Sequence, residues 1–153
     1  MQDPDLIDLW KLHTTQNLDV LGAMKRMKKK SYIATERIDD GGLFEDDIEK
    51  LLNDMNIPIL KHNVDVLDPN TKIVLGEIDF ELSSVIIEST VGKNSKTRQM
   101  KMYTEEAPML FNPNNKPIVV YGPQYRGGAV EREITSRGGR VIRDFEDFLK
   151  LIQ

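Results

Sequence analysis

Two early segments of the chain repeat their apolar residues at the spacing of an α-helix. In residues 1–30 apolar side chains recur three or four positions apart, and five cations fall within residues 25–30. These cations are typical of a solvated helix end, where the dipole favours positive charge; contact with phosphates is the alternative. We predict a helical extension over residues 1–34, followed by a single domain over residues 35–153.

The second helical segment covers residues 43–54, with acids in its first turn and Pro58 beyond its end. At about 100° per residue, Glu45 lies on the edge of the apolar stripe, whereas Asp46 and Asp47 face away from it. One acid of this helix is therefore expected to look toward the margin of the core.

Strand-like patterns follow, and the pattern then changes to alternating strands and helices. Residues 57–67, 72–81 and 84–90 have the short runs and flanking turn residues of antiparallel strands. After a polar loop and a helix, residues 117–152 alternate two short apolar runs with two amphipathic segments. This βαβα pattern predicts parallel strands joined by a right-handed crossover. The complete order predicts an α/β fold, with a mixed sheet covered by helices on both faces.

Composition limits the available chemistry. The chain has 153 residues, 39% of them hydrophobic, which suffices for one domain with a real core. No run approaches about eighteen apolar residues, so we expect neither a membrane span nor an N-terminal secretion signal. The lack of cysteine excludes thiolate metal sites and thiol nucleophiles, which leaves carboxylates, hydroxyls and two histidines.

Charge is divided unevenly along the chain. Residues 1–90 hold 18 acidic and 10 basic residues, whereas residues 91–153 hold 7 acidic and 11 basic residues. An acidic part can gather cations and a basic part can receive a polyanion, which is the division that a metal-dependent nuclease needs. The pattern is compatible with that class without selecting it, because surface charge also segregates by chance.

The stretch 76–90, GEIDFELSSVIIEST, places acids on alternate residues of one strand and Glu88 after three apolar residues of the next. With a two-residue turn at 82–83, Asp79 would face Ile86 and be the diagonal neighbour of Glu88, roughly 7–8 Å away. Alternating acids alone are typical of a half-exposed strand, but an ionised Glu88 in a central strand is costly without a partner. We therefore predict that Asp79 and Glu88 are close partners with a divalent cation or a proton between them, because two ionised carboxylates at this distance would repel. The opposite face of this hairpin would hold Ile78, Phe80, Val85 and Ile87.

This combination of motifs resembles the PD-(D/E)xK, or restriction-endonuclease-fold, nuclease superfamily. FE near the start of a helix, then GEID, then IIE-x-T, and a polar helix with KTRQ fall within residues 42–99. Within the superfamily, the arrangement most resembles the C-terminal toxin domains of bacterial polymorphic and contact-dependent growth inhibition toxins. The resemblance implies that Asp79 and Glu88 are metal-binding acids and that Glu45 is the helix acid that joins them.

The sequence departs from the superfamily pattern at its lysine. Thr90 stands two residues after Glu88, where the superfamily usually has Lys. The resemblance implies that a lysine from the following segment replaces it, either Lys96, which shares a helix face with Gln99, or Lys93. Thr90 would then supply a hydroxyl at the site, and Gln99 would orient one of the reacting groups.

Further cations are candidate contacts to a nucleic-acid backbone. Arg98 follows Lys96 in the polar helix, and Arg126 lies in YGPQYRGG, which can hold a phosphate or be a plain strand-to-helix turn. Lys93 belongs to the same group of candidate contacts. The arginines of SRGGRVIR can line a binding groove or simply be exposed near a helix stop.

The resemblance implies a metal-dependent endonuclease that hydrolyses phosphodiester bonds. Carboxylate ligands without Cys or a neighbouring His favour Mg²⁺ or Mn²⁺ over Zn²⁺. Family habit favours RNA, tRNA in particular, over DNA. It also implies a secreted toxin module that acts in the target-cell cytoplasm and is blocked by a cognate immunity protein. The alternative is a non-catalytic nucleic-acid- or protein-binding module that retains the fold. Thr90 at the position of the usual lysine favours this alternative.

Overall fold

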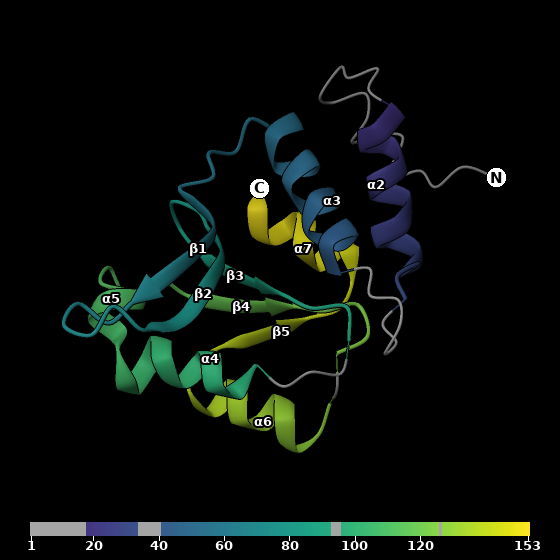
Figure 1. Cartoon of the computed structure of the whole chain (residues 1–153). Helices are drawn as coiled ribbons and strands as arrows, with labels where there is room; N and C mark the ends of the chain where they lie inside the picture. The colour runs from purple at the N-terminus through teal and green to yellow at the C-terminus, as the bar shows by residue number, and fades with distance from the viewer. Residues whose placement is uncertain (1–17, 34–40, 93–95, 126) are drawn as a thin grey trace.

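The structure is a computed structural model that describes residues 18–33, 41–92, 96–125 and 127–153 (Figure 1). The helices in these ranges are α2 (Leu18–Lys29), α3 (Gly41–Asp54), α4 (Thr97–Lys101), the π-helical turn η1 (Met102–Glu106), α5 (Pro108–Phe111), α6 (Ala129–Ser136) and α7 (Phe145–Ile152). The strands are β1 (Lys61–Leu67), β2 (Val74–Glu81), β3 (Ile86–Ser89), β4 (Ile118–Tyr121) and β5 (Arg140–Ile142). The predicted boundary at residue 34 and the first half of the predicted extension lie outside the described residues.

The five strands of the described chain form one mixed sheet in the order β1-β2-β3-β4-β5. β1, β2 and β3 pair antiparallel, whereas β3, β4 and β5 pair parallel. The parallel strands predicted from the βαβα pattern of the last third of the chain are therefore confirmed. Every residue of β3 and β4 is buried, as expected for strands in a parallel region covered on both faces.

Helices cover both faces of this sheet (Figure 1). On one face, α2, α3 and α7 pack over a core cluster that includes Phe44, Ile87 and Tyr121. On the other, α4, η1, α5 and α6 pack over a cluster that includes Ile86 and Val120. The predicted α/β class, a mixed sheet between helical layers, is confirmed. None of the described helices combines the length and the apolar character that a membrane span requires.

α2 is joined to α3 by a partly buried ion pair. Asp47, which the helical pattern placed on the outer face, is instead 0% exposed. Its carboxylate accepts hydrogen bonds from Arg26 Nε and Nη2 at 2.9 and 2.7 Å and from Tyr32 Oη at 2.6 Å. The prediction for Asp47 was wrong because its partners come from α2 and the residues after it, which no local periodicity reveals. α2 also places apolar side chains in the core cluster beneath α3.

The β2–β3 hairpin has a longer turn than the sequence predicted. Phe80 pairs with Ile87 and Glu81 with Ile86, so residues 82–85 form the connection rather than residues 82–83 alone. The two additional residues preserve the parity of the register, because side chains alternate with a period of two. In this register Asp79 lies directly opposite Glu88, not diagonal to it.

One predicted face of the hairpin is also wrong. Ile78 packs in the cluster with Ile86, whereas Phe80 packs in the opposite cluster with Ile87. The simple alternation breaks at Asp79, whose position in the register lies opposite Asn63 of β1. Asn63 has a left-handed backbone with φ of 53°, a conformation that bends a strand out of its regular pleat. The candidate site is located at this bend.

Candidate active site

The backbone hydrogen bonds between β2 and β3 end where Asp79 lies opposite Glu88. Beyond that point, hydrogen bonds from backbone amides to side-chain carboxylates join the two strands. The Asp79 amide donates to Glu88 Oε2 at 3.2 Å, and the Ser89 amide donates to Asp79 Oδ2 at 2.9 Å. Each strand therefore satisfies a buried backbone N–H with a carboxylate from the other strand. Both acids are almost fully buried, at 5% and 1% exposure. The predicted Asp79–Glu88 juxtaposition is present, held by these bonds.

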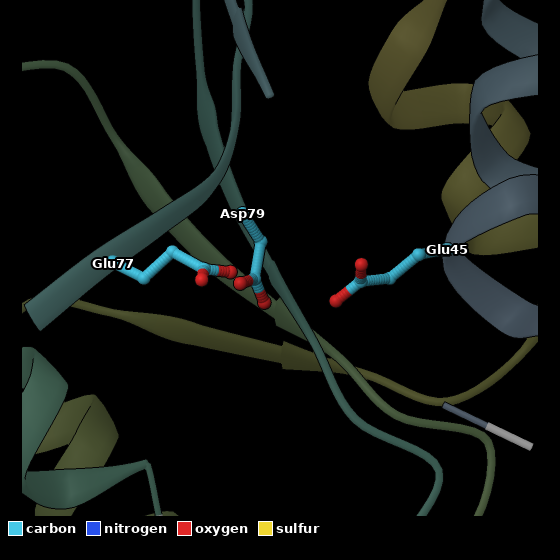
Figure 2. A group of neighbouring side chains, drawn as sticks. All are labelled: Glu45, Glu77 and Asp79. Carbon is cyan, nitrogen blue, oxygen red and sulfur yellow. The ribbon is translucent and has the colours of Figure 1, made fainter. Parts of the chain in front are cut away.

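Asp79 also belongs to a group of three carboxylates that come from two elements (Figure 2). Glu45 reaches over from α3, while Glu77 and Asp79 project from β2, and their oxygens lie within 4.8 Å of one another. Asp79 is buried, Glu45 is half-buried and Glu77 is exposed, so the group opens to solvent at one side. Glu88 is not part of this group; Glu77 takes the place that the sequence analysis gave it.

Lys96 completes the site from the next helix. It stands at the start of α4, and its Nζ lies 3.6 Å from Asp79 Oδ2. Burial alone would lower the pKa of Lys96, but Asp79, Glu88 and Glu45 together raise it above its ordinary value. The side chain is 24% exposed, so the protonated ammonium remains within reach of a ligand. The structure thus brings Lys96, one of two alternatives, to the predicted acids.

Gln99 and Tyr103, which are four residues apart, donate hydrogen bonds to residues of the site. The Gln99 side-chain amide donates to the backbone carbonyl of Glu77. Tyr103 Oη donates to Glu88 Oε1 at 2.9 Å from a buried position. With Asp79 N–H on Oε2, both carboxylate oxygens of Glu88 are bonded to protein groups. Gln99 is at the predicted site, but it contacts backbone rather than a carboxylate or Lys96.

The charge of Asp79 affects the pKa values of three neighbouring acids. Burial first, and then the charge of Asp79, raise the pKa of Glu45 and of Glu77. The same two causes, in the same order, raise the pKa of Glu88 well above its usual range. Burial and a like charge both disfavour the ionised form of a carboxyl, and a cation that enters the group stabilises that ionised form.

The carboxylate group suits a hard divalent cation. Glu45, Glu77 and Asp79 offer only oxygen ligands, which Mg²⁺ and Mn²⁺ prefer. Two oxygens on one Mg²⁺ are about 3–4 Å apart, since each lies about 2.1 Å from the metal. Separations within 4.8 Å can close to that range by small side-chain rotations. The residues present therefore fit the ion that the sequence analysis expected.

The remaining predicted site residues are less directly involved. Thr90 uses its hydroxyl to accept the Gly92 amide at 3.3 Å, a local turn rather than a contact to the acids. Arg98 is exposed on α4. Lys93 and Arg126 lie outside the described residues.

The arginines near the end of the chain are engaged with acids. Arg137 bonds to Glu133 and Glu105, and Arg143 forms a bidentate pair with Glu131 at 2.8 and 3.2 Å. Such pairing reduces the positive charge that these two side chains offer to a nucleic-acid backbone.

Two participants were not recognised as site residues from the sequence. Glu77 precedes Asp79 by two positions, so the period of a strand already placed both on one face. Tyr103 follows Gln99 by four positions and so shares its helix face, but nothing local tied a tyrosine to Glu88. Together the site offers hard oxygen ligands, a protonated amine and partial shielding from water. No protein-family model, curated protein or solved structure matches the chain.

Proposed function

We propose that the protein is a metal-dependent endonuclease of the PD-(D/E)xK type, which hydrolyses phosphodiester bonds in nucleic acid. The observation that carries the proposal is the distance of 3.6 Å between Lys96 Nζ and Asp79 Oδ2, beside the carboxylates of Glu45 and Glu77. A lysine at a cluster of acids is what the superfamily pattern requires, and Thr90 does not supply it.

Glu45, Glu77 and Asp79 would hold the cation. When bound, Mg²⁺ supplies a coordinated water of lowered pKa and neutralises charge on the scissile phosphate. The Lys96 ammonium, which its neighbours keep protonated, donates hydrogen bonds to the attacking water or to the phosphate oxygens as negative charge develops. Glu88 fixes the backbone of Asp79 through its amide, and Tyr103 fixes Glu88.

On family grounds we further propose RNA, tRNA in particular, as the substrate and an interbacterial toxin as the biological context. The protein would then be secreted within a larger toxin, act in the cytoplasm of the target cell and be blocked by a cognate immunity protein. These statements depend on the resemblance and not on a contact within the structure.

The activity is tested by incubating the protein with plasmid DNA and with total tRNA, in Mg²⁺ or Mn²⁺ and then in EDTA. We expect metal-dependent cleavage that falls at least about 100-fold in Asp79→Asn and in Lys96→Met, because each removes a group at the reacting phosphate. Asp46→Asn and Lys50→Met are matched controls, since both residues are exposed on α3. Intact substrates under every metal would refute the proposal.

The second candidate is a non-catalytic binding module. It is favoured by the engagement of Glu88, whose two oxygens are both bonded to protein groups, and of the Thr90 hydroxyl. This candidate predicts retention of labelled nucleic acid on the protein without cleavage, equal in Mg²⁺ and in EDTA.

A further inference from the structure

The start of α4 is held by a residue from a distant loop. Lys96 is the N-cap of α4, and within the described part of the chain no side chain caps this end of the helix. The Lys96 amide instead donates to Tyr125 Oη at 2.9 Å, across 29 positions of sequence. Tyr125 lies between β4 and α6 and is only 4% exposed. The backbone that carries the site lysine is therefore bonded to a buried hydroxyl.

Tyr125 is itself fixed at several points. Its amide donates to the Gly122 carbonyl at 3.1 Å, and the Gly122 amide donates to Ile142 of β5 at 2.9 Å. A Cβ on Gly122 would lie 2.9 Å from Tyr125 Cβ and 3.1 Å from the Thr90 carbonyl oxygen. Because only glycine fits that space, the turn can close against the end of β3.

An arginine secures the same residue from the other side. Arg143 Nε donates to the Tyr125 carbonyl at 2.9 Å, while its guanidinium forms the bidentate pair with Glu131 of α6. The Tyr125 ring packs in the core cluster that also holds Met100 of α4 and Ile134 of α6. Packing and hydrogen bonds therefore leave the Tyr125 hydroxyl little freedom to move away from Lys96.

We propose that Tyr125 is a positioning residue for Lys96: its hydroxyl fixes the backbone from which the lysine reaches Asp79. This inference rests on the proposed function, because it assigns Tyr125 a role only if Lys96 acts in the reaction. Among the described residues, the hydroxyl of Tyr125 is bonded to the Lys96 amide and not to the acids, so Tyr125 acts through the lysine. Displacement by a fraction of an ångström matters, since Lys96 Nζ already lies 3.6 Å from the nearest oxygen of Asp79.

The test is Tyr125→Phe, which removes one oxygen and keeps the ring in the core. Loss of one hydrogen bond predicts a fall in kcat of about 3- to 10-fold with KM unchanged. Tyr121→Phe is the matched control, because the Tyr121 hydroxyl is buried and has no hydrogen-bond partner among the described residues. We expect that control to keep both constants. Exchange of the Lys96 amide hydrogen, followed by NMR, should accelerate in Tyr125→Phe and not in Tyr121→Phe.

A double-mutant cycle separates positioning from a general loss of structure. In a Lys96→Ala background, Tyr125→Phe should cause no further loss of the residual cleavage, because the group that it positions is gone. Equal kcat in the wild type and Tyr125→Phe, or an equal loss with and without Lys96, would overturn the inference while cleavage by the wild type still stands. A wild-type protein inactive on every substrate would instead overturn the proposed function, and the positioning role with it.

Discussion

The substitution Glu45→Gln should have opposite effects on the protein with and without metal. Glu45 is half-buried within 4.8 Å of the Asp79 and Glu77 oxygens, and burial followed by the charge of Asp79 raises its pKa. Two ionised carboxylates 4.8 Å apart repel by about 3 kcal/mol at an effective dielectric constant of about 20. Solvent at the open side of the group and the hydrogen bond from Asn63 reduce the net penalty, to about 1 kcal/mol.

Without metal, removal of this charge should stabilise the protein. About 1 kcal/mol corresponds to a rise in Tm of about 2–4 °C for a domain of this size. With metal, the wild type should gain about 2.7 kcal/mol at a concentration of 100 times Kd, or about 5–10 °C. Glu45→Gln should gain much less, because it has lost one ligand. The order of the two Tm values therefore reverses between EDTA and Mg²⁺.

Thermal unfolding followed by circular dichroism, in EDTA and across a titration of Mg²⁺ or Mn²⁺, measures both effects. Asp46→Asn removes an exposed acid from the neighbouring position of α3 and should behave as the wild type does. If the wild type shows no metal-dependent rise in Tm, or Glu45→Gln shows the same rise, Glu45 is not a ligand and the carboxylate group is not the metal site.

Three further substitutions test the supports of the site. Glu88→Gln should flatten the pH dependence of stability in EDTA. Because the pKa of Glu88 is raised in the folded state, the wild-type Glu88 favours folding below its unfolded-state pKa of about 4.3 and this contribution is lost as the pH rises through the folded-state pKa. A wild-type Tm that does not fall faster with rising pH than that of Glu88→Gln contradicts the assignment. Asp47→Ala should lower the free energy of unfolding by about 2–4 kcal/mol, because it leaves Arg26 and Tyr32 without their acceptor. Urea denaturation measures this loss, and the metal titration should show an unchanged rise in Tm with Mg²⁺. Gly76→Ala places a Cβ 3.0 Å from Gln99 Oε1 and 3.1 Å from Phe111, and should reduce cleavage several-fold for a loss of stability of about 1 kcal/mol; unchanged cleavage would show that Gln99 does not matter.

The order of the elements could be predicted from the sequence because each is encoded locally. The short apolar runs of β4 and β5 and the Gly after α6 are signals within a few residues, and they predicted the parallel region. The hairpin register was wrong by two residues, yet Asp79 and Glu88 remained on the same face of the sheet, because an even error does not exchange the faces of a strand. An odd error would have separated them.

What the sequence could not provide are contacts between distant segments. The buried position of Asp47 depends on Arg26 in another helix, and no helical wheel of α3 contains that information. Glu88 lies outside the carboxylate group while its two oxygens accept from Tyr103 and from the Asp79 amide, and Tyr103 is 15 positions away along the chain. Asn63 bends β1 opposite Asp79, and the alternation of β2 breaks at that point, so that Phe80 and Ile78 pack on different faces.

The bend and the end of the ladder explain how one short region can serve the fold and also hold the carboxylates of the proposed site. Where β2 and β3 stop exchanging backbone bonds, Asp79 and Glu88 each take over a backbone amide of the opposite strand. That use occupies Oε2 of Glu88, and Tyr103 occupies Oε1, so Glu88 is the structural acid of the pair. The Asp79 carboxylate, which accepts the Ser89 amide through Oδ2, also lies within 4.8 Å of the Glu45 and Glu77 oxygens. The division predicts that Glu88→Gln retains part of the metal-dependent rise in Tm, whereas Asp79→Asn loses it, and equal responses of the two variants would show that the acids are equivalent ligands after all.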